Sequence, residues 1–302
     1  MHHSVPPFNL PGHWFRGNLH VHSTTSDGDL PPEQVIQFYR EHGYRFLAFT
    51  DHRVLSPGRR VAEDFIVLSG IEADGRDPES GLYHLVGLGT AHAPDILWGE
   101  PLSIQAAVDR MRAAQGLVML AHPYWSGQMS KDLLVLEGCF GLEVYNGGCD
   151  VDDAKGLSAV HWDDLLAAGR SFYGLATDDA HWRSGTKDAG LGWVWVRAAQ
   201  LTQEAILDAL AKGHFYASSG TEIHDLALDP VQRIATVRCS PSTAIDFVGN
   251  SLYSRRVSAP HGQTLTEATY KLREGQRYVR VACRDEQCHW AWSNPIFLDT
   301  RG

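Results

Sequence analysis

The 302-residue sequence predicts an α/β fold in which a parallel (β/α) barrel over residues 1–221 precedes a small antiparallel β-sandwich over residues 222–302. Short apolar runs alternate with helical segments up to about residue 220, which is the order of a parallel sheet with right-handed crossovers. Metal-ligating side chains recur where the apolar runs end. In such a barrel these ends share one rim, so residues far apart in sequence become neighbours.

The first strand is expected over residues 16–22, with His20 and His22 on one face because strand side chains alternate. A Ser/Thr-rich turn follows, from which Asp27 can fold back towards the two imidazoles. Two imidazoles and a carboxylate so close together are the start of a divalent-metal site.

A helix over residues 30–45 has prolines in its first turn and Gly43 past its end. Apolar runs predict further strands at 46–52, 65–74, 82–89, 116–123, 141–147, 171–181, 191–196 and 214–220. Helices are expected between them at 103–115, 133–138, 162–169 and 202–213.

Six candidate ligands stand at or just past the ends of these strands: His22, His52, Glu72, His122, Asp179 and His181. Local capping would explain one or two of them, but not six at the same end. His84 lies inside its strand and is either a further ligand or an interior histidine with a hydrogen-bonded partner.

Beyond residue 222 the helical periodicity stops, and short alternating strands punctuated by Pro, Gly and Asn predict the β-sandwich. This segment is open to interpretation as a packing, dimerisation or binding element.

Composition is that of an ordinary globular protein, with 43% hydrophobic and 21% charged residues. A formal charge of −10 argues against general nucleic-acid binding, because no basic face would attract a phosphate backbone. Five cysteines without a CxxC pair fit free thiols in a reducing compartment. Neither a membrane span nor a signal core is apparent, so we expect a cytoplasmic protein that does not bind membranes, and His2 and His3 receive no role.

Five short motifs follow one another at the strand ends: LHVHSTTSDG, FTDH, GIE, AHP and DDAH. In this order they resemble the polymerase and histidinol phosphatase (PHP) superfamily of metallohydrolases, over residues 16 to about 220. HPYWSG, EVYNGG, LATDDAH, FYASSG and AWSNPIFL resemble its carbaryl hydrolase subgroup. The resemblance implies a distorted (β/α)7 TIM-like barrel of PHP type.

The same resemblance implies a first metal held by His20, His22, Glu72 and Asp179. A second would take Asp27, His52 and His181, with Glu72 or a hydroxide bridging towards the first. A third site, where the family has one, falls on His122, again with Glu72 as a bridging carboxylate.

Imidazole and carboxylate ligands without thiolate suit Zn²⁺, Mn²⁺ or Fe²⁺, and ligand type does not choose among them. Asp51 and Asp178 stand beside ligands, either as acceptors that orient the histidines or as solvated rim carboxylates.

Two or three clustered divalent ions favour hydrolysis by a metal-bridging hydroxide. The resemblance makes a phosphoester, and hence a small anionic substrate, the first hypothesis. Arg183 and Arg53 are candidates to bind the non-bridging oxygens, and His161 is a candidate to protonate the leaving group.

Two alternatives remain open. One is hydrolysis of a carbamate or carboxyl ester with an aryl leaving group, because Tyr124, Trp125 and Trp182 directly follow ligands or their neighbours and could line an apolar pocket. The other is a non-catalytic, metal-stabilised binding module. The full set of ligands argues against the second.

Overall fold

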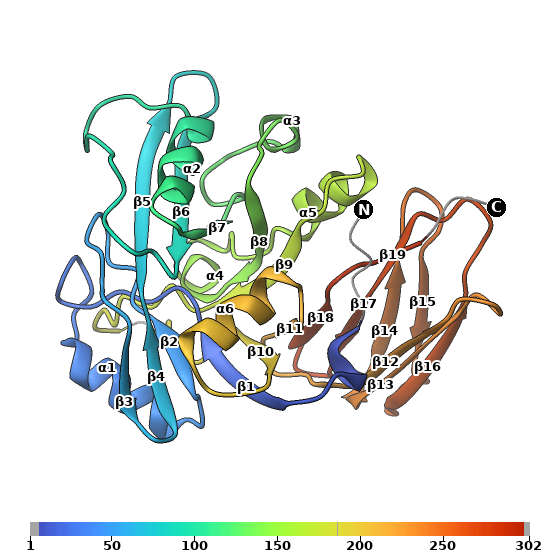
Figure 1. The fold of residues 1–302 in the computed structure, drawn as a ribbon. Helices are drawn as coiled ribbons and strands as arrows, with labels where there is room; N and C mark the ends of the chain where they lie inside the picture. Colours follow the sequence, from blue (N-terminus) through green and yellow to red (C-terminus); the bar gives the residue numbers. More distant parts are fainter. Residues whose placement is uncertain (1–5, 186, 299–302) are drawn as a thin grey trace.

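The computed structural model describes residues 6–185 and 187–298, so His2 and His3 lie outside the described residues. Its largest sheet has eleven strands, in the order β15-β14-β17-β18-β11-β10-β1-β2-β4-β3, with β19 beside β17 (Figure 1). The first part of the chain contributes β1 (His13–Asn18), β2 (Phe46–Ala48), β3 (Arg59–Ala62), β4 (Phe65–Leu68), β10 (Trp193–Ala198) and β11 (Phe215–Ser218). The last part contributes β14 (Ala244–Val248), β15 (Arg255–Ser258), β17 (Tyr278–Arg284), β18 (Trp290–Ser293) and β19 (Ile296–Phe297).

A second sheet follows chain order and has five strands, β5 (Gly70–Asp77), β6 (Gly81–Leu88), β7 (Leu117–Leu120), β8 (Cys139–Asn146) and β9 (Tyr173–Thr177). Strands β1-β2-β4 and β7-β8-β9 pair in parallel, as expected. Strand β6, however, is antiparallel to both neighbours. The turn between β5 and β6 spans only residues 78–80, which is too short for a crossover to a parallel strand.

The ladders of these two sheets do not close into the barrel that the sequence predicts. The chain passes from β4 to β5 at Ser69, and two isolated parallel bridges, Val21 with Ala180 and His52 with Glu72, span the gaps between the sheets. Both bridges lie just beyond the ends of β1, β2 and β9, where the candidate ligands stand.

Helices cover the sheets, and most begin where the sequence indicates. They are α1 (Pro32–Glu41), α2 (Ile104–Ala113), α3 (Ser130–Leu133), α4 (Gly147–Asp153), α5 (Ala159–Ala167) and α6 (Gln203–Ala211), with a 3₁₀ turn at Pro7–Asn9. Ser103 caps α2 by accepting from the Ala106 amide, and Thr202 caps α6 in the same way. The helix expected at 133–138 is absent from the described chain, since α3 ends at Leu133.

The strands after residue 222 are antiparallel, as predicted. Strands β12 (Ile223–Asp229), β13 (Ile234–Ser242) and β16 (Leu265–Lys271) form a separate three-stranded sheet. Its apolar side chains share a buried cluster with residues of β14 and β17. Pairing of β18 with β11 makes the other C-terminal strands continuous with the largest sheet. The β-sandwich and the boundary at residues 221/222 stay predictions.

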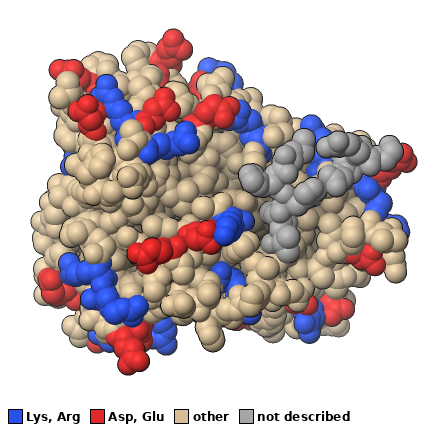
Figure 2. Space-filling model, viewed as in Figure 1, with Lys and Arg blue, Asp and Glu red and all other residues tan. Residues whose placement is uncertain are grey.

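Within the described ranges, no helix is long and apolar enough to span a membrane. Figure 2 shows Lys and Arg beside Asp and Glu near the middle of one face as well as around its edge, and the described residues visible there form no broad patch of a single sign. This face therefore offers no extended basic surface.

Candidate metal centre

The bridge between Val21 and Ala180 brings two pairs of candidate ligands together. The His22 amide donates to the Ala180 carbonyl at 3.1 Å, and the Asp179 amide donates to the His20 carbonyl at 2.9 Å. His20 and His22 stand on either side of Val21 in the chain, and Asp179 and His181 stand on either side of Ala180. Residues about 160 positions apart therefore meet, although both pairs lie beyond the regular strands.

The bridge between His52 and Glu72 joins a third and a fourth segment to the same place. The Arg53 amide donates to the Glu72 carbonyl at 2.8 Å, and the Thr50 amide donates to the Val21 carbonyl at 2.9 Å. Backbone hydrogen bonds therefore hold all four ligand-bearing segments in register.

His20, His22, Glu72 and Asp179 form a fully buried group. Glu72 Oε2 lies 3.2 Å from Nε2 of both histidines, and Asp179 Oδ1 lies 3.1 and 3.0 Å from the same two nitrogens. Neither of these carboxylate oxygens has a hydrogen-bond partner among the described residues. Buried polar atoms are nearly always satisfied, so two unpartnered oxygens facing two imidazole nitrogens fit a cation.

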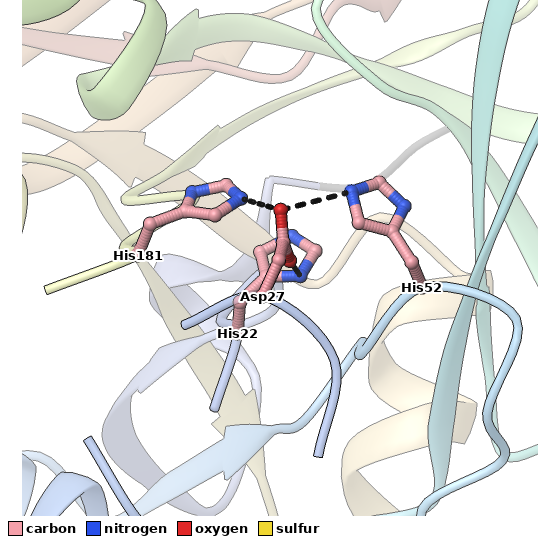
Figure 3. Close-up of side chains that lie close together, drawn as sticks. All are labelled: His22, Asp27, His52 and His181. Carbon is pink, nitrogen blue, oxygen red and sulfur yellow. Dashed lines mark ion pairs between the residues drawn. The ribbon is translucent and has the colours of Figure 1, made fainter. Parts of the chain in front are cut away.

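His22, Asp27, His52 and His181 form a second, more open group (Figure 3). The Asp27 carboxylate lies between two imidazoles, with Oδ2 3.3 Å from His181 Nε2 and 4.0 Å from His52 Nε2. Its other oxygen is 3.5 Å from His22 Nδ1. Since His22 belongs to both groups, the two candidate sites are contiguous.

His84 and His122 lie on the opposite side of Glu72. His84 Nδ1 is 2.8 Å from Glu72 Oε1, and His122 Nε2 is 3.6 Å from the same oxygen. His122 also approaches Asp179 Oδ2 at 3.7 Å and forms a possible ligand group with Cys149 and Asp179. All nine predicted ligands are therefore brought together, and Cys149 is a neighbour that sequence reasoning did not name.

Glu143, within β8, is a second neighbour outside the predicted ligand set, although the sequence marks it as a polar residue towards the end of its strand. It accepts from His20 Nδ1 at 2.7 Å, from the Thr177 hydroxyl at 2.7 Å, and from the His122 amide at 2.8 Å. Asn146 connects Glu143 to Asp179 through its side-chain amide, at 2.7 and 3.1 Å. The pattern GLEVYN, another apolar strand ending in polar residues, was the signal for both.

Asp51 and Asp178 do not orient the histidines, contrary to one of the two roles considered for them. Asp51 accepts hydrogen bonds from Ser23 and Ser26 and so fixes the turn that presents Asp27. Asp178 accepts from the Tyr39 hydroxyl and from the amides of residues 190–192. Both are buried, so neither is a solvated rim carboxylate. Their register directs them to loops instead of the imidazoles.

A cavity of about 170 Å³ opens over the ligands. Arg183 lines it, with Nη2 3.8 Å from Asp27 Oδ2. Arg53 instead pairs with Asp74 through two hydrogen bonds of 3.0 and 2.5 Å and lines a neighbouring cavity. His161 is not brought to either one, because its Nε2 donates to the Gln128 carbonyl at 2.9 Å.

Of the three aromatic residues expected near the ligands, Trp125 lines the cavity. Its indole nitrogen donates to Asp153 at 2.6 Å. Tyr124 is 45% exposed, and the Trp182 indole donates to the His22 carbonyl at 3.0 Å. One aromatic wall, not three, therefore faces the candidate metal groups within the described chain.

Charge accumulates strongly in this centre. Burial would lower the pKa of His20, but Asp179, Glu72 and Glu143 raise it well above its usual value. For His22, burial is again outweighed by Asp179 and Glu72, and its pKa rises to about 9. The same pairings hold the pKa values of Glu72 and Asp179 below their usual range, although burial opposes this. The carboxylates therefore stay ionised and draw positive charge, which is the electrostatic setting of a cation site.

Four of the nine described non-glycine residues with a positive φ angle lie at this centre. Arg53, His122, Asp179 and Trp182 have positive φ angles of 62°, 25°, 53° and 63° although none is glycine. Such conformations persist only where the surrounding structure enforces them, and they gather at functional sites.

No family model matches the chain. Over 78 residues it is 41% identical to the phosphoribosyl 1,2-cyclic phosphate 1,2-diphosphodiesterase of Eggerthella lenta, a match that covers 24% of this chain and 30% of that protein. The chain therefore matches under a third of that relative's length.

The fold is similar to that of a two-domain protein from Bacteroides vulgatus that contains a predicted PHP-like metal-dependent phosphoesterase. The TM-score is 0.53 at 14% identity, and the match covers 91% of each chain. This likeness supports the PHP-like fold that the motifs indicate. The carbaryl hydrolase subgroup stays a prediction.

Proposed function

We propose that this chain is a metal-dependent phosphoesterase that acts on a small phosphoester. One observation carries the proposal: two groups of candidate ligands share His22, and members of both groups line one cavity. Two carboxylate oxygens among them, on Glu72 and Asp179, have no hydrogen-bond partner within the described chain. The fold neighbour and the partial sequence relative point in the same direction.

The donor set fits two or three divalent ions. His20, His22, Glu72 and Asp179 would hold the first, and Asp27, His52 and His181 the second, with Glu72 placed to bridge. His122 and His84 would complete a third site on the other oxygen of Glu72. Imidazole and carboxylate ligands suit Zn²⁺, Mn²⁺ or Fe²⁺.

When bound, such ions supply a water nucleophile of lowered pKa and positive charge beside the phosphoryl oxygens. The protein's own contribution is to arrange charge. Divalent ions held there would offset the negative charges of Asp27, Glu72 and Asp179 and would present positive charge directly to a phosphoryl oxygen. This reconciles an anionic substrate with a chain whose formal charge is −10.

Arg183 is the residue we assign to the phosphoryl oxygens. It stands at the mouth of the cavity beside Asp27, and a guanidinium can donate two hydrogen bonds to one phosphate. Arg53 pairs with Asp74 and His161 binds the Gln128 carbonyl, so we assign neither of them to the phosphoryl group.

Metal analysis of the purified protein, followed by assays on nitrophenyl phosphate and bis-nitrophenyl phosphate, tests this function. Asp179→Asn and His52→Ala should lose both metal and turnover, whereas His224→Ala, an exposed histidine on β12, should keep both. Wild-type metal content and turnover in Asp179→Asn and His52→Ala would refute the assignment.

Trp125 in the cavity wall favours one alternative, hydrolysis of an aryl carbamate or carboxyl ester at the same centre. Naphthyl methylcarbamate, assayed in parallel, distinguishes the two. Turnover of the carbamate alone would replace the phosphoester proposal with this one.

A further inference from the structure

A second cavity of about 340 Å³ lies beside the candidate metal centre. Its walls come from Arg53, from the facing ends of β5 and β6, and from the loop at residues 96–102. The size is within the range of small-molecule sites, and the walls combine apolar side chains with a few polar groups. None of its lining residues belongs to the proposed ligand set.

The Asp74 carboxylate connects this cavity to the metal centre. Its Oδ1 lies 3.3 Å from His52 Nδ1 and accepts from Arg53 Nε at 3.0 Å, while Oδ2 accepts from Arg53 Nη2 at 2.5 Å. His52 lines the first cavity, and Arg53 and Asp74 line the second. One side chain, Asp74, therefore separates His52 from the second cavity.

The walls indicate what the second cavity would accept. Trp98 is partly buried, packs against the main apolar cluster and has the Arg53 guanidinium 5.8 Å from its ring centre. Leu82, Ile96 and Leu102 add apolar surface. Two basic residues, Arg53 and Arg76, are balanced by two acidic residues, Asp74 and Glu100, so the lining carries no net charge.

A neutral lining does not compete with the metal centre for a phosphate. An indole face and a guanidinium plane are instead the surfaces on which planar rings stack. This combination differs from that of the first cavity, whose walls carry five acidic residues, four histidines and Arg183.

We propose that this second cavity binds the organic part of the phosphoester, and that this part is a planar aromatic group such as an aryl ring or a nucleobase. The inference rests on the proposed phosphoesterase function and adds the substrate class. Trp98 is its specificity-determining residue, and Arg53 and Asp74 position the wall next to His52.

Calorimetric binding of non-hydrolysable phosphonates to the metal-loaded protein tests this proposal without requiring turnover. The probes are methylphosphonate and three aryl compounds of increasing reach: phenyl-, benzyl- and naphthylmethylphosphonate. At least one aryl compound should bind about tenfold more tightly than methylphosphonate, since aromatic stacking contributes on the order of 1–3 kcal/mol. Trp98→Ala should remove that preference and leave methylphosphonate binding unchanged.

Two further variants make the result specific. Trp290→Ala is the matched control, because Trp290 is also partly buried and has Arg284 5.6 Å from its ring centre, yet lies on β18 outside both cavities. It should keep the preference. Trp125→Ala removes the aromatic wall of the first cavity. Loss of the preference in Trp125→Ala but not in Trp98→Ala would overturn the proposal.

Equal binding of all four phosphonates to the wild-type protein would also overturn the proposal while leaving the phosphoesterase function intact. If the metal-loaded protein binds none of the four phosphonates, the metal centre does not bind phosphoryl groups. The proposed function then fails together with this inference.

Discussion

Glu143 accepts a hydrogen bond from Nδ1 of His20 at 2.7 Å, deep in the centre of the protein. Because the buried carboxylate accepts, a proton is on Nδ1, and Nε2, which faces Glu72 and Asp179, is the nitrogen that would bind a metal ion. The contact therefore sets both the tautomer and the orientation of a candidate ligand. A carboxylate that accepts from the second nitrogen of a metal-binding histidine also makes that histidine a more basic ligand.

Glu143→Gln should lower metal affinity by about 10–100-fold, because the amide no longer holds the His20 imidazole with a full negative charge. Gln keeps the size of the side chain and one oxygen for His20 Nδ1 and Thr177, but its amide group would face the donors of His122 and Asn146. A far-UV circular dichroism spectrum equal to that of the wild type is therefore the control for folding. Metal titration of the stripped protein measures the change.

Glu137→Gln is the matched control. Its carboxylate is 72% exposed and pairs with Arg170 far from the ligands, so its metal affinity should equal that of the wild type. Equal affinity in Glu143→Gln would mean that the hydrogen bond to His20 does not support the site.

Metal removal should reduce stability, because ions bind the folded centre and its ligands are scattered in the unfolded chain. At a metal concentration one hundred times the dissociation constant, the gain in unfolding free energy is about 2.7 kcal/mol. Thermal melts with and without added Zn²⁺ or Mn²⁺ measure it. The melting temperature of Asp179→Asn should not rise when metal is added. A rise equal to that of the wild-type protein would mean that the ion binds elsewhere.

The clustering of the candidate ligands was predictable from the sequence for a physical reason. Alternation along extended segments places His20 with His22 and Asp179 with His181, and strand ends bring such pairs to one rim. The strand pairing was less predictable, because a three-residue turn at residues 78–80 makes β6 antiparallel. Two open sheets joined by single bridges result, in place of a closed barrel.

The orienting residues were less predictable as well. Asp51 follows a strand and precedes His52, while Glu143 lies within β8; yet Asp51 binds the turn at Ser23, and Glu143 is the carboxylate that binds His20. One residue of register decides which face a side chain takes, and sequence pattern does not fix it where strands bulge, as β8 does between Glu143 and Tyr145. The cavity around Trp98 depends on an irregular loop and has no sequence signature.

Asp77 should stabilise the protein in a pH-dependent way. Its carboxylate accepts from the amides of Glu79, Ser80 and Ile104, at 2.7, 2.9 and 2.8 Å. Burial opposes ionisation, but these hydrogen bonds lower the pKa below its ordinary value of 3.8. A carboxyl group whose pKa is lower in the folded state adds stability above the unfolded value and loses it as pH falls through the folded value.

Asp77→Asn should therefore lower the free energy of unfolding by about 1.5–3 kcal/mol near neutral pH. The difference from the wild type should shrink below about pH 4. Urea unfolding at several pH values measures it. Asp229→Asn is the control, since Asp229 accepts from two amides of an exposed turn at 2.9 and 2.8 Å. This substitution should change the free energy of unfolding by no more than about 0.5 kcal/mol. A difference for Asp77→Asn that grows towards acid pH would contradict this account.

Arg280 on β17 and Asp163 on α5 join the C-terminal strands to a helix of the part that carries the candidate metal centre. Two hydrogen bonds of 2.7 Å connect them, and the guanidinium lies 4.6 Å from the centre of the Trp162 ring. Since β18 also pairs with β11, the segments before and after residue 222 share both a sheet and this ion pair. We therefore expect the chain to unfold in one transition.

Arg280→Ala should lower the unfolding free energy by about 2–4 kcal/mol, because the Asp163 carboxylate, 33% exposed, would lose its partner. Arg256→Ala is the matched control: its bonds to Asp246 are 2.7 and 2.6 Å, but its side chain is 54% exposed, so the cost should stay below about 1 kcal/mol. The unfolding transition should be measured by calorimetry and by urea melts followed with far-UV circular dichroism and tryptophan fluorescence. In Arg280→Ala it should shift by the same amount in every probe. Two transitions, with Arg280→Ala moving only one, would show instead that the C-terminal strands unfold as a separate domain, because the sheet continuity would then carry no cooperativity.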